Sequence, residues 1–370
     1  MHKDSLQSLI ALRLTHGVGP VALQHLLAYC PNPQNIYKLS KSRLMRIPEI
    51  GEKTASAILQ KNHFKTAESE IKWCEEKGIR IISYLDAEYP AWLKEIPDLP
   101  ILIFVKGNMR INSVPWIAVV GTRTPDIYGK KMAEEFTRQL ISSGVGILSG
   151  LALGIDAEAH KSALQNKGIT AAVLGHGLDR IYPWRHAKLA EQICDSGGCL
   201  ITEYLSGTPP DAVNFPSRNR IVAGICKAVL VIQAAQTGGA LITARLAFDY
   251  NREVFAIPGQ IGQKYSEGCN HIITKQIAQL VQTPYDILEQ LGWKENTPPL
   301  PLPKIQKAEI PLHPDEKKLI LLLEEGDISI DTLSEKSGFP ISQLQSRLLS
   351  MEIRELIRFL PGKKISIKNN

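Results

Sequence analysis

The feature that most constrains this chain is the alternation of strand-like and helix-like segments between Trp116 and Gly259. Apolar runs predict strands at 117–120, 145–148, 170–174, 199–203, 228–232 and 253–257. Helical patterns between them predict helices at 129–142, 154–166, 186–196 and 239–250, with a short helix beginning at Arg218. Such alternation requires right-handed crossovers, so the sequence predicts an α/β fold with a mostly parallel sheet and helices on both faces.

Residues 1–68 predict a separate helical domain. Two turns within it, Gly17-Val-Gly-Pro20 and Ile47-Pro-Glu-Ile-Gly51, resemble the hairpin of a helix-hairpin-helix motif. The glycines of that hairpin let backbone N–H groups approach a nucleic-acid phosphate. In the second turn, Glu49 occupies the first glycine position and places a carboxylate where the phosphate would lie. A helical module for protein contacts is therefore an equally open interpretation.

The central domain is expected to span 69–293, followed by a proline-rich linker over 294–314. Residues 315–370 predict three helices and a hairpin around Pro361-Gly362, which resembles a winged helix. Its candidate recognition helix contains a single arginine, and residues 312–370 carry nine basic and nine acidic side chains. We therefore expect a protein-contact or regulatory module in preference to a DNA reader.

Composition excludes several classes of protein. The chain has 370 residues, 44% hydrophobic and 22% charged, with no apolar run near the roughly 20 residues of a membrane span and no signal-peptide pattern at its start. This predicts a cytoplasmic protein without a membrane partner. Six cysteines without a Cys-x-x-Cys pair predict reduced thiols and neither a zinc site nor a disulfide framework. The net charge of +6 permits a polyanionic partner.

Loops rich in glycine follow several of the predicted strands and carry the candidate binding site. A phosphate at Gly121-Thr122-Arg123 would meet backbone N–H groups, a hydroxyl and a guanidinium, although the arginine could instead pair with a carboxylate. The run 149–156 contributes Ser149, Gly150 and Gly154 at the start of a helix. We expect Asp156 and His160, four residues apart, to hold this loop in place.

Two further loops are expected to converge on the same edge of the sheet. Arg218, Asn219 and Arg220 place two cations beside an apolar segment, where burial requires either a bound anion or a structural ion pair. Gly238 and Gly239 follow another strand and precede a helix. The sequence lacks a Gly-x-Gly-x-x-Gly run, a P-loop, a Gly-x-Ser-x-Gly elbow and metal-ligand pairs. These residues therefore predict binding without catalysis, and no cofactor or metal.

Taken together, these motifs resemble the DNA processing protein A (DprA, also called Smf) family over residues 80–285. The matching runs include Val120-Gly-Thr-Arg123, Ser149-Gly-Leu-Ala-Leu-Gly-Ile-Asp156, Ala172-Val-Leu-Gly175, Tyr182-Pro183, Phe215-Pro216, Arg218-Asn-Arg-Ile221, Gly238–Ala244 and Pro258-Gly259. The resemblance implies an extended Rossmann-like, doubly wound domain between an N-terminal helix-hairpin-helix or SAM-like domain and a C-terminal winged-helix-like domain. It also implies a homodimer that binds single-stranded DNA without sequence preference, protects it during natural transformation and loads the RecA recombinase.

The family's DNA pocket carries over to Gly121, Thr122 and Arg123, and to the basic residues Arg180, Arg218 and Arg220. The chain departs from the family pattern at Ser217, His186, Gln233, Thr237 and Lys275-Gln276. Aromatic residues near the pocket, which could stack bases or simply pack, are Tyr128, Tyr182, Trp184 and Phe215. The alternatives are a nucleoside monophosphate hydrolase, whose catalytic glutamate is missing after Thr237-Gly-Gly, and an interaction scaffold with vestigial anion loops.

Overall fold

The computed structural model describes residues 3–293, 313–323, 326, 328–353, 356–360 and 364–367. These residues form two compact units, one within Met1–Lys294 and one within Glu295–Asn370. The predicted linker lies outside the described residues except for His313 and Pro314, and so does the turn predicted at Pro361-Gly362.

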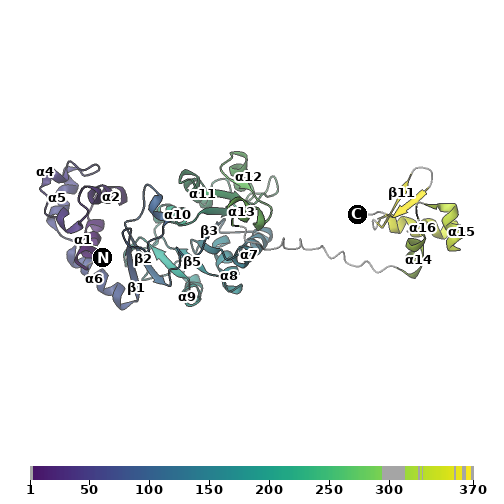
Figure 1. Cartoon of the computed structure of the whole chain (residues 1–370), viewed down its shortest axis with the longest axis horizontal. Coiled ribbons are helices and arrows are strands. Elements are labelled where there is room, and N and C mark those ends of the chain that lie inside the picture. The colour runs from purple at the N-terminus through teal and green to yellow at the C-terminus, as the bar shows by residue number, and fades with distance from the viewer. Residues whose placement is uncertain are drawn as a thin grey trace. The chain divides into compact units, whose positions relative to one another are not determined.

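The first unit begins with six helices (Figure 1): α1 (Lys3–Leu14), α2 (Pro20–Tyr29), α3 (Pro33–Ile36), α4 (Lys41–Leu44), α5 (Glu52–Gln60) and α6 (Phe64–Glu76). Their apolar side chains form a core that includes Leu12, Leu26 and Ile58. The helical domain was expected to end at residue 68, but α6 continues to Glu76, and its Ile71 and Cys74 also face the interior. The domain boundary predicted at residue 68 therefore falls inside a helix.

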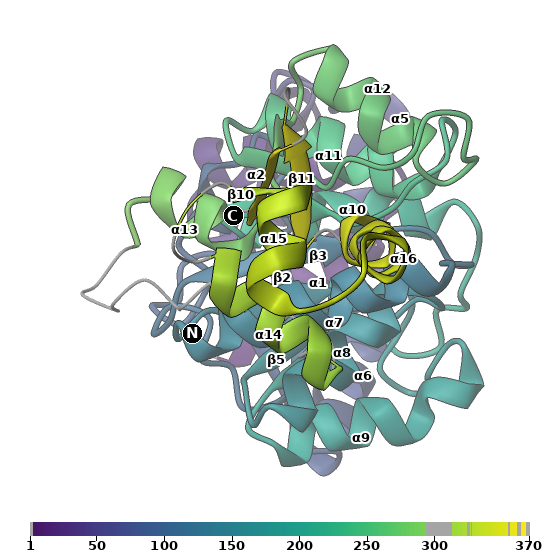
Figure 2. The same ribbon diagram turned by 90° about the vertical axis from the view of Figure 1, so that its right-hand side faces the viewer.

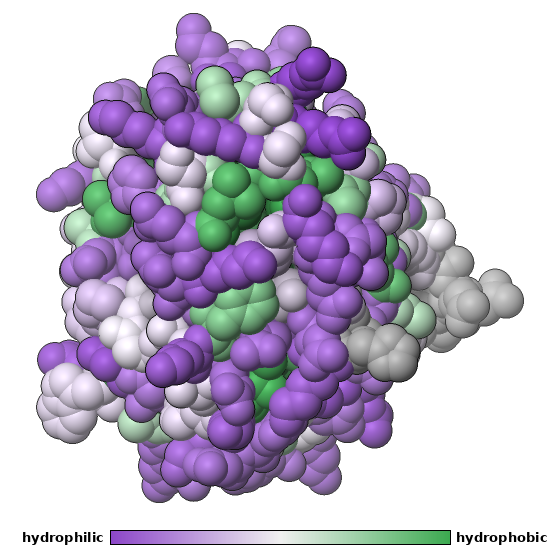
Figure 3. All heavy atoms as spheres, turned by 90° about the vertical axis from the view of Figure 1, so that its left-hand side faces the viewer, coloured by the Kyte–Doolittle hydropathy of each residue, from purple (hydrophilic) through white to green (hydrophobic). Residues whose placement is uncertain are grey.

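The two predicted hairpins lie against each other. Gly17 has φ +83°, and a Cβ atom there would come within 2.4 Å of the Thr54 hydroxyl on α5, so only glycine fits. Glu49 adopts φ 68°, which keeps the glycine-like backbone of the second turn, and its side chain is exposed. Hydrophilic side chains cover most of the outer face of these helices, with small apolar areas between them (Figure 3).

The same unit contains a nine-stranded sheet in the order β1-β2-β6-β5-β4-β3-β7-β8-β9. Strands β1 and β2 pair antiparallel with each other, β2 pairs antiparallel with β6, and all other neighbours are parallel, which confirms the predicted sheet. The strands are β1 (Ile79–Ser83), β2 (Leu102–Gly107), β3 (Trp116–Val120), β4 (Gly146–Ser149), β5 (Thr170–Val173), β6 (Cys199–Thr202), β7 (Ala228–Val231), β8 (Glu253–Ala256) and β9 (Gln279–Leu280).

Helices cover both faces of this sheet, as Figures 1 and 2 show. One face packs on α7 (Ile127–Ser142), α8 (Ile155–Gln165), α9 (Ala187–Asp195) and α13 (Pro284–Gln290). The other packs on α10 (Asn214–Ile225), α11 (Gly239–Asp249), α12 (Glu267–Thr274) and the 3-10 helix η1 (Trp92–Glu95), while the second 3-10 helix, η2 (Trp184–His186), precedes α9. Residues of β3 alternate between the two cores, Ile117 and Val119 toward one and Ala118 and Val120 toward the other.

The strand order reverses at β3, which lies between β4 and β7. The segment leaving β3 crosses one face through α7, whereas the segment leaving β7 crosses the other through α11. The loops at the carboxyl ends of these two strands therefore diverge, and a crevice opens between them. This is the edge of the sheet where the glycine-rich loops were predicted to meet.

The second unit contains α14 (Pro314–Leu323), β10 (Ile328–Ser329), α15 (Ile330–Ser337), α16 (Ile341–Ile353), β11 (Ile357–Leu360) and β12 (Lys364–Ile367). Its three strands form a sheet in the order β10-β12-β11, around a core that includes Leu319, Leu333 and Leu344. The predicted winged-helix-like fold is confirmed, with β10 as an additional short strand. The single arginine of α16, Arg347, forms an ion pair with Asp315 at 2.7 Å.

The N-terminal helices are fastened to the sheet by a buried carboxylate. Glu70 on α6 accepts hydrogen bonds from the backbone N–H of Ser206, at 2.8 Å, and from the Ser206 hydroxyl, beyond the end of β6. We expect Glu70→Ala to lower the free energy of opening of α6 by about 1–3 kcal/mol, because it leaves the partly buried Ser206 N–H without this partner. Hydrogen exchange of the α6 amides measures this opening.

The matched control is Glu68→Ala on the same helix. Glu68 is exposed and forms an ion pair with Lys72 one turn away, so its removal should change the opening free energy by less than about 0.5 kcal/mol. Equal effects of the two substitutions would show that the Glu70 contact does not hold the helices on the sheet.

Candidate nucleic-acid interface

A cleft of about 610 Å³ lies at the carboxyl edge of the sheet, where the strand order reverses. It is lined by the loops that follow β3, β4 and β7 and by residues of α10 and α11. The structure brings eight of the twelve predicted site residues to this cleft: Gly121, Thr122, Arg123, Gly150, Arg218, Asn219, Gly238 and Gly239.

The loop after β3 is locked to its neighbours through backbone bonds. The Thr122 N–H donates to the Gln233 carbonyl at 2.7 Å, and the Thr122 carbonyl accepts from the Ile155 N–H at 3.1 Å. A Cβ atom on Gly121 would lie 2.5 Å from Ile155, and one on Gly154 would lie 2.3 Å from the Thr122 carbonyl. Both glycines are therefore required by close contact, and the loop presents a fixed backbone to the cleft.

Arg123 is exposed at this loop and points its guanidinium over the Phe215 ring, with 5.6 Å from Cζ to the ring centroid. Within the described ranges, it forms no ion pair with a carboxylate, so the predicted alternative of a structural ion pair is not what the geometry shows. Tyr182 lies beside Phe215, with 5.8 Å between ring centroids. A cation and two aromatic rings thus form one wall of the cleft.

Arg218 occupies the floor of the cleft and is buried. Its Nη1 donates to the carbonyls of Gly150, at 2.7 Å, and Val173, while Nε donates to Asn219 at 3.2 Å. A Cβ atom on Gly150 would come within 2.3 Å of this guanidinium, so a residue with a side chain would displace it. Burial lowers the pKa of Arg218, and the nearby Asp156 carboxylate opposes that shift.

The loop after β4 is held from below by Asp156 and His186. The Asp156 carboxylate accepts hydrogen bonds from the N–H groups of Gly150, at 3.0 Å, and Ala152, at 3.3 Å. Burial raises the pKa of Asp156, whereas Arg218 and these hydrogen bonds lower it. His186 Nδ1 lies 2.9 Å from the Leu151 carbonyl. These contacts agree with the expectation that Asp156 supports the loop.

His160 lies deeper, on α8, and is fully buried. The Thr170 hydroxyl donates to the Ile147 carbonyl, so it must accept from His160 Nδ1, which lies 2.7 Å away and carries the proton. Nε2 is then a bare acceptor, buried and without a partner among the described residues. Burial, with the nearby His186 and Arg218, lowers the pKa of His160 to about 3.

Four predicted site residues lie outside the lining of the cleft. Ser149 is buried and donates its hydroxyl to the Val119 carbonyl, and Gly154 supports the β3 loop from behind. Arg180 is exposed and pairs with Asp179 at 2.7 Å. Arg220 was expected at the cleft, but its guanidinium is buried against the Glu203 carboxylate.

Tyr265, which lines the cleft, and Gln233, which supports it, were not among the predicted site residues. Tyr265, from the loop before α12, lines the cleft and accepts a hydrogen bond from Thr124 at 2.6 Å. Gln233 binds the Asp126 carboxylate through Nε2 at 2.9 Å, and so fixes the start of α7. Of the aromatic candidates, Tyr182 and Phe215 line the cleft, whereas Tyr128 and Trp184 do not.

Residues 80–292 match the family model of DNA recombination-mediator protein A, and residues 303–363 match the DprA winged helix domain. The chain belongs to the DNA recombination-mediator protein A family. It is 39% identical to Protein Smf of Escherichia coli over 310 residues, which cover 82% of each chain. It is 37% identical to DNA processing protein DprA of Streptococcus pneumoniae over 276 residues, covering 69% of this chain and 96% of that protein.

Two solved structures of this family resemble the chain. DNA processing protein A from S. pneumoniae superimposes with a TM-score of 0.66 at 33% identity, covering 78% of this chain and 98% of that one. DNA processing protein A from Helicobacter pylori, solved for its single-stranded DNA binding mode, has a TM-score of 0.52 at 28% identity, covering 58% and 95%. The resemblance found in the sequence is thereby confirmed.

No helix among the described residues has the length and apolarity that crossing a bilayer requires. Within the same ranges, no group of three or more His, Cys, Asp or Glu side chains is arranged to hold a metal ion.

The protonation state of His160 predicts an acid-sensitive fold. The folded protein keeps this histidine neutral with a pKa of about 3, whereas an unfolded chain titrates it near 6.5. The unfolded state binds more protons between these values, so this contribution to stability is present above about pH 6.5 and is lost as the pH falls toward 3. We expect His160→Leu to have a shallower fall in unfolding free energy from pH 7 to 4 than the wild type, in denaturant titrations.

His271, an exposed histidine on α12, provides the control. The variant His271→Leu should follow the wild-type pH dependence. If His160→Leu also retained the wild-type slope, proton uptake by the buried histidine would not be the cause of acid sensitivity.

Proposed function

We propose that this protein binds single-stranded DNA in the cleft at the carboxyl edge of the sheet, without preference for base sequence. The proposal rests mainly on Arg123, because its guanidinium is exposed and has no carboxylate partner in the described part of the chain. It lies beside a rigid glycine loop and the Tyr182–Phe215 pair. A phosphate would meet the cation and loop N–H groups, while the rings offer stacking surfaces for bases.

The electrostatics of the cleft favour a polyanion. Among the described residues that line it, Arg123 and Arg218 are cationic and Asp156 is the one acid. The Asp156 carboxylate is already occupied by two backbone N–H groups, and Arg218 offsets its charge. Contacts to phosphate carry no sequence information, which fits binding to strands of any sequence. The structure of the H. pylori relative, solved for its single-stranded DNA binding mode, supports the same assignment.

The wider role we propose is DNA processing in transformation and recombination. The protein would act in the cytoplasm as a homodimer, protect incoming single strands and load the RecA recombinase onto them. Family membership and relatives named DNA processing protein DprA support the processing role. Binding, not turnover, is proposed because the one carboxylate among the described lining residues, that of Asp156, is engaged by the Gly150 and Ala152 N–H groups.

The decisive substitution is Arg123→Ala. We expect it to weaken binding of single strands of different sequence to the same degree, and to reduce the slope of log affinity against log salt by about 0.7 for one lost phosphate contact. Equilibrium binding of a labelled single strand and the matching duplex over a salt series measures both quantities. Arg138→Ala, on α7 outside the cleft, is the charge-matched control.

Other results of these titrations would indicate a different DNA site or a different function. Wild-type affinity and slope in Arg123→Ala would place the DNA site elsewhere. If neither DNA form bound, incubation with nucleoside monophosphates would follow, and release of free base would identify a hydrolase. A protein inactive in both assays would be a scaffold.

The second unit should be dispensable for this binding. The arginine of α16 is engaged by Asp315, and residues 312–370 have no net charge. We expect a chain lacking residues 312–370 to bind single-stranded DNA within about twofold of the full chain, a difference below 0.5 kcal/mol. The same titrations measure it, and a tenfold loss of affinity would assign DNA contacts to the winged helix.

A further inference from the structure

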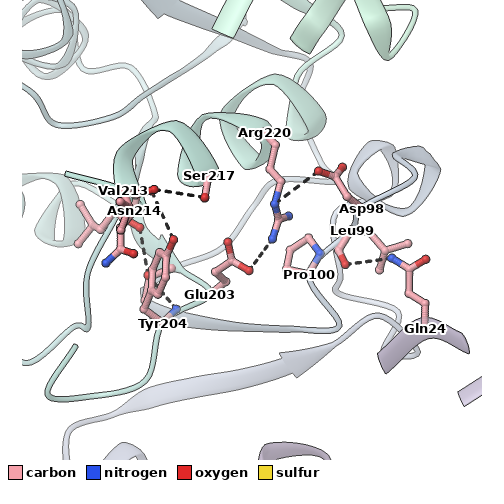
Figure 4. A network of polar contacts seen from close by, with 12 residues as sticks. Gln24, Asp98, Leu99, Pro100, Glu203, Tyr204, Val213, Asn214, Ser217 and Arg220 are labelled. Carbon is pink, nitrogen blue, oxygen red and sulfur yellow. Dashed lines mark hydrogen bonds and ion pairs between the residues drawn. The ribbon is translucent and has the colours of Figure 1, made fainter. Parts of the chain in front are cut away.

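Helix α10 presents its basic residues in two directions. Arg218 and Arg220 are two positions apart, which corresponds to about 200° around a helix. Arg218 and Asn219 line the cleft, whereas Arg220 extends from the other side of α10 toward the end of β6 and the segment before β2 (Figure 4). The motif that supplies the cleft therefore also supplies a buried cation that does not reach it.

Two carboxylates hold this cation. Arg220 Nη2 donates to Glu203 at 2.5 Å, and Nε lies 3.7 Å from Asp98. The side chains of Arg220 and Glu203 are 8% and 4% exposed, so this is a desolvated pair. Arg220 Nη1 is buried without a hydrogen-bond partner in the described ranges, which leaves Glu203 and Asp98 as the groups that fix the guanidinium.

The carboxylates are themselves fixed. Asp98 accepts a hydrogen bond from Tyr250, after α11, at 2.7 Å. The neighbouring Leu99 carbonyl accepts from Gln24 on α2 at 3.3 Å, so the segment is tied to the N-terminal helices as well. Next to Glu203, the Tyr204 hydroxyl donates to the Asn214 carbonyl in the first turn of α10 at 3.3 Å. Glu203 and Tyr204 thus bind α10 at two positions, Arg220 and Asn214.

We propose that Arg220 is a positioning residue for the DNA cleft, anchored by Glu203 and Asp98. Two points of attachment along α10 fix its rotation about its own axis, and that rotation sets the positions of Arg218 and Asn219 at the cleft. A buried ion pair adds little net stability over an apolar pair, but removal of one partner leaves an uncompensated buried charge that shifts the surrounding structure. This inference rests on the proposed function, because it takes the cleft as the DNA site.

The test uses a substitution for which general electrostatics and the positioning role predict opposite changes in DNA affinity. Glu203→Gln removes a negative charge, so general electrostatics predicts tighter binding of a polyanion. Positioning predicts weaker binding, by about three- to thirtyfold for a network that acts at a distance. Because Arg220 does not contact phosphate, the plot of log affinity against log salt should shift in parallel, without the reduced slope expected for Arg123→Ala.

The measurement is binding of a labelled single strand to the full chain over a salt series, well below the unfolding midpoint of each variant. Arg220→Lys, which retains the charge but not the planar fork, should weaken binding to a similar degree. Asp98→Asn tests the same network at a half-exposed position and replaces Glu203→Gln if that variant does not fold. Asp249→Asn, an exposed carboxylate of α11, is the control that should not weaken binding.

The outcomes separate this inference from the proposed function. Unchanged or tighter binding by Glu203→Gln and Asp98→Asn, with weak binding by Arg123→Ala, would overturn the positioning role alone. A reduced salt slope in Arg220→Lys relative to wild type would also overturn it, because it would show a direct phosphate contact. If Arg123→Ala bound normally, the cleft would not be the DNA site and both proposals would fall.

Discussion

The architecture of the cleft depends on the burial of one guanidinium, that of Arg218. A cation removed from water is costly unless its donors and its charge are matched. Here the carbonyls of Gly150 and Val173 accept hydrogen bonds from it and Asp156 supplies an opposing charge. These partners come from the loop after β4, the end of β5 and the start of α8, so a single side chain of α10 joins three other elements.

The two arginines that line the cleft differ in their partners and in their exposure to solvent. Arg218 is committed to protein carbonyls and shapes the cleft, whereas Arg123 is exposed and its charge is available to a ligand. Two glycines also shape the cleft. Gly150 makes room for the Arg218 guanidinium, and Gly121 lets the β3 loop pack against α8. In the function that we propose, affinity would depend on Arg123 and the shape of the cleft on Arg218, so substitutions should affect the two separately.

The sheet, its helices and the edge that holds the site were predictable, because buried parallel strands are continuous apolar runs and glycine loops follow their carboxyl ends. The burial of Arg220 away from this edge could not be predicted. A helix that begins at Arg218 would place residues 218–220 in its first turn, near the loops, but α10 begins at Asn214. Arg220 therefore lies in the body of the helix and points away from Arg218. The extent of α6 was not predicted either, because the helical domain was expected to end at residue 68, whereas Ile71 and Cys74 of α6 are buried.

Gln233 shows how contacts distant in sequence adjust the charge at the site. A glutamate at this position would face the Asp126 carboxylate directly. The amide of Gln233 instead donates to Asp126 and accepts from its backbone N–H at 3.3 Å. Asp126 also accepts from the Gly129 N–H at 2.8 Å and caps α7, immediately after the loop that carries Arg123. The neutral amide thus keeps α7 in place without a second negative charge beside the cation that we expect to meet phosphate.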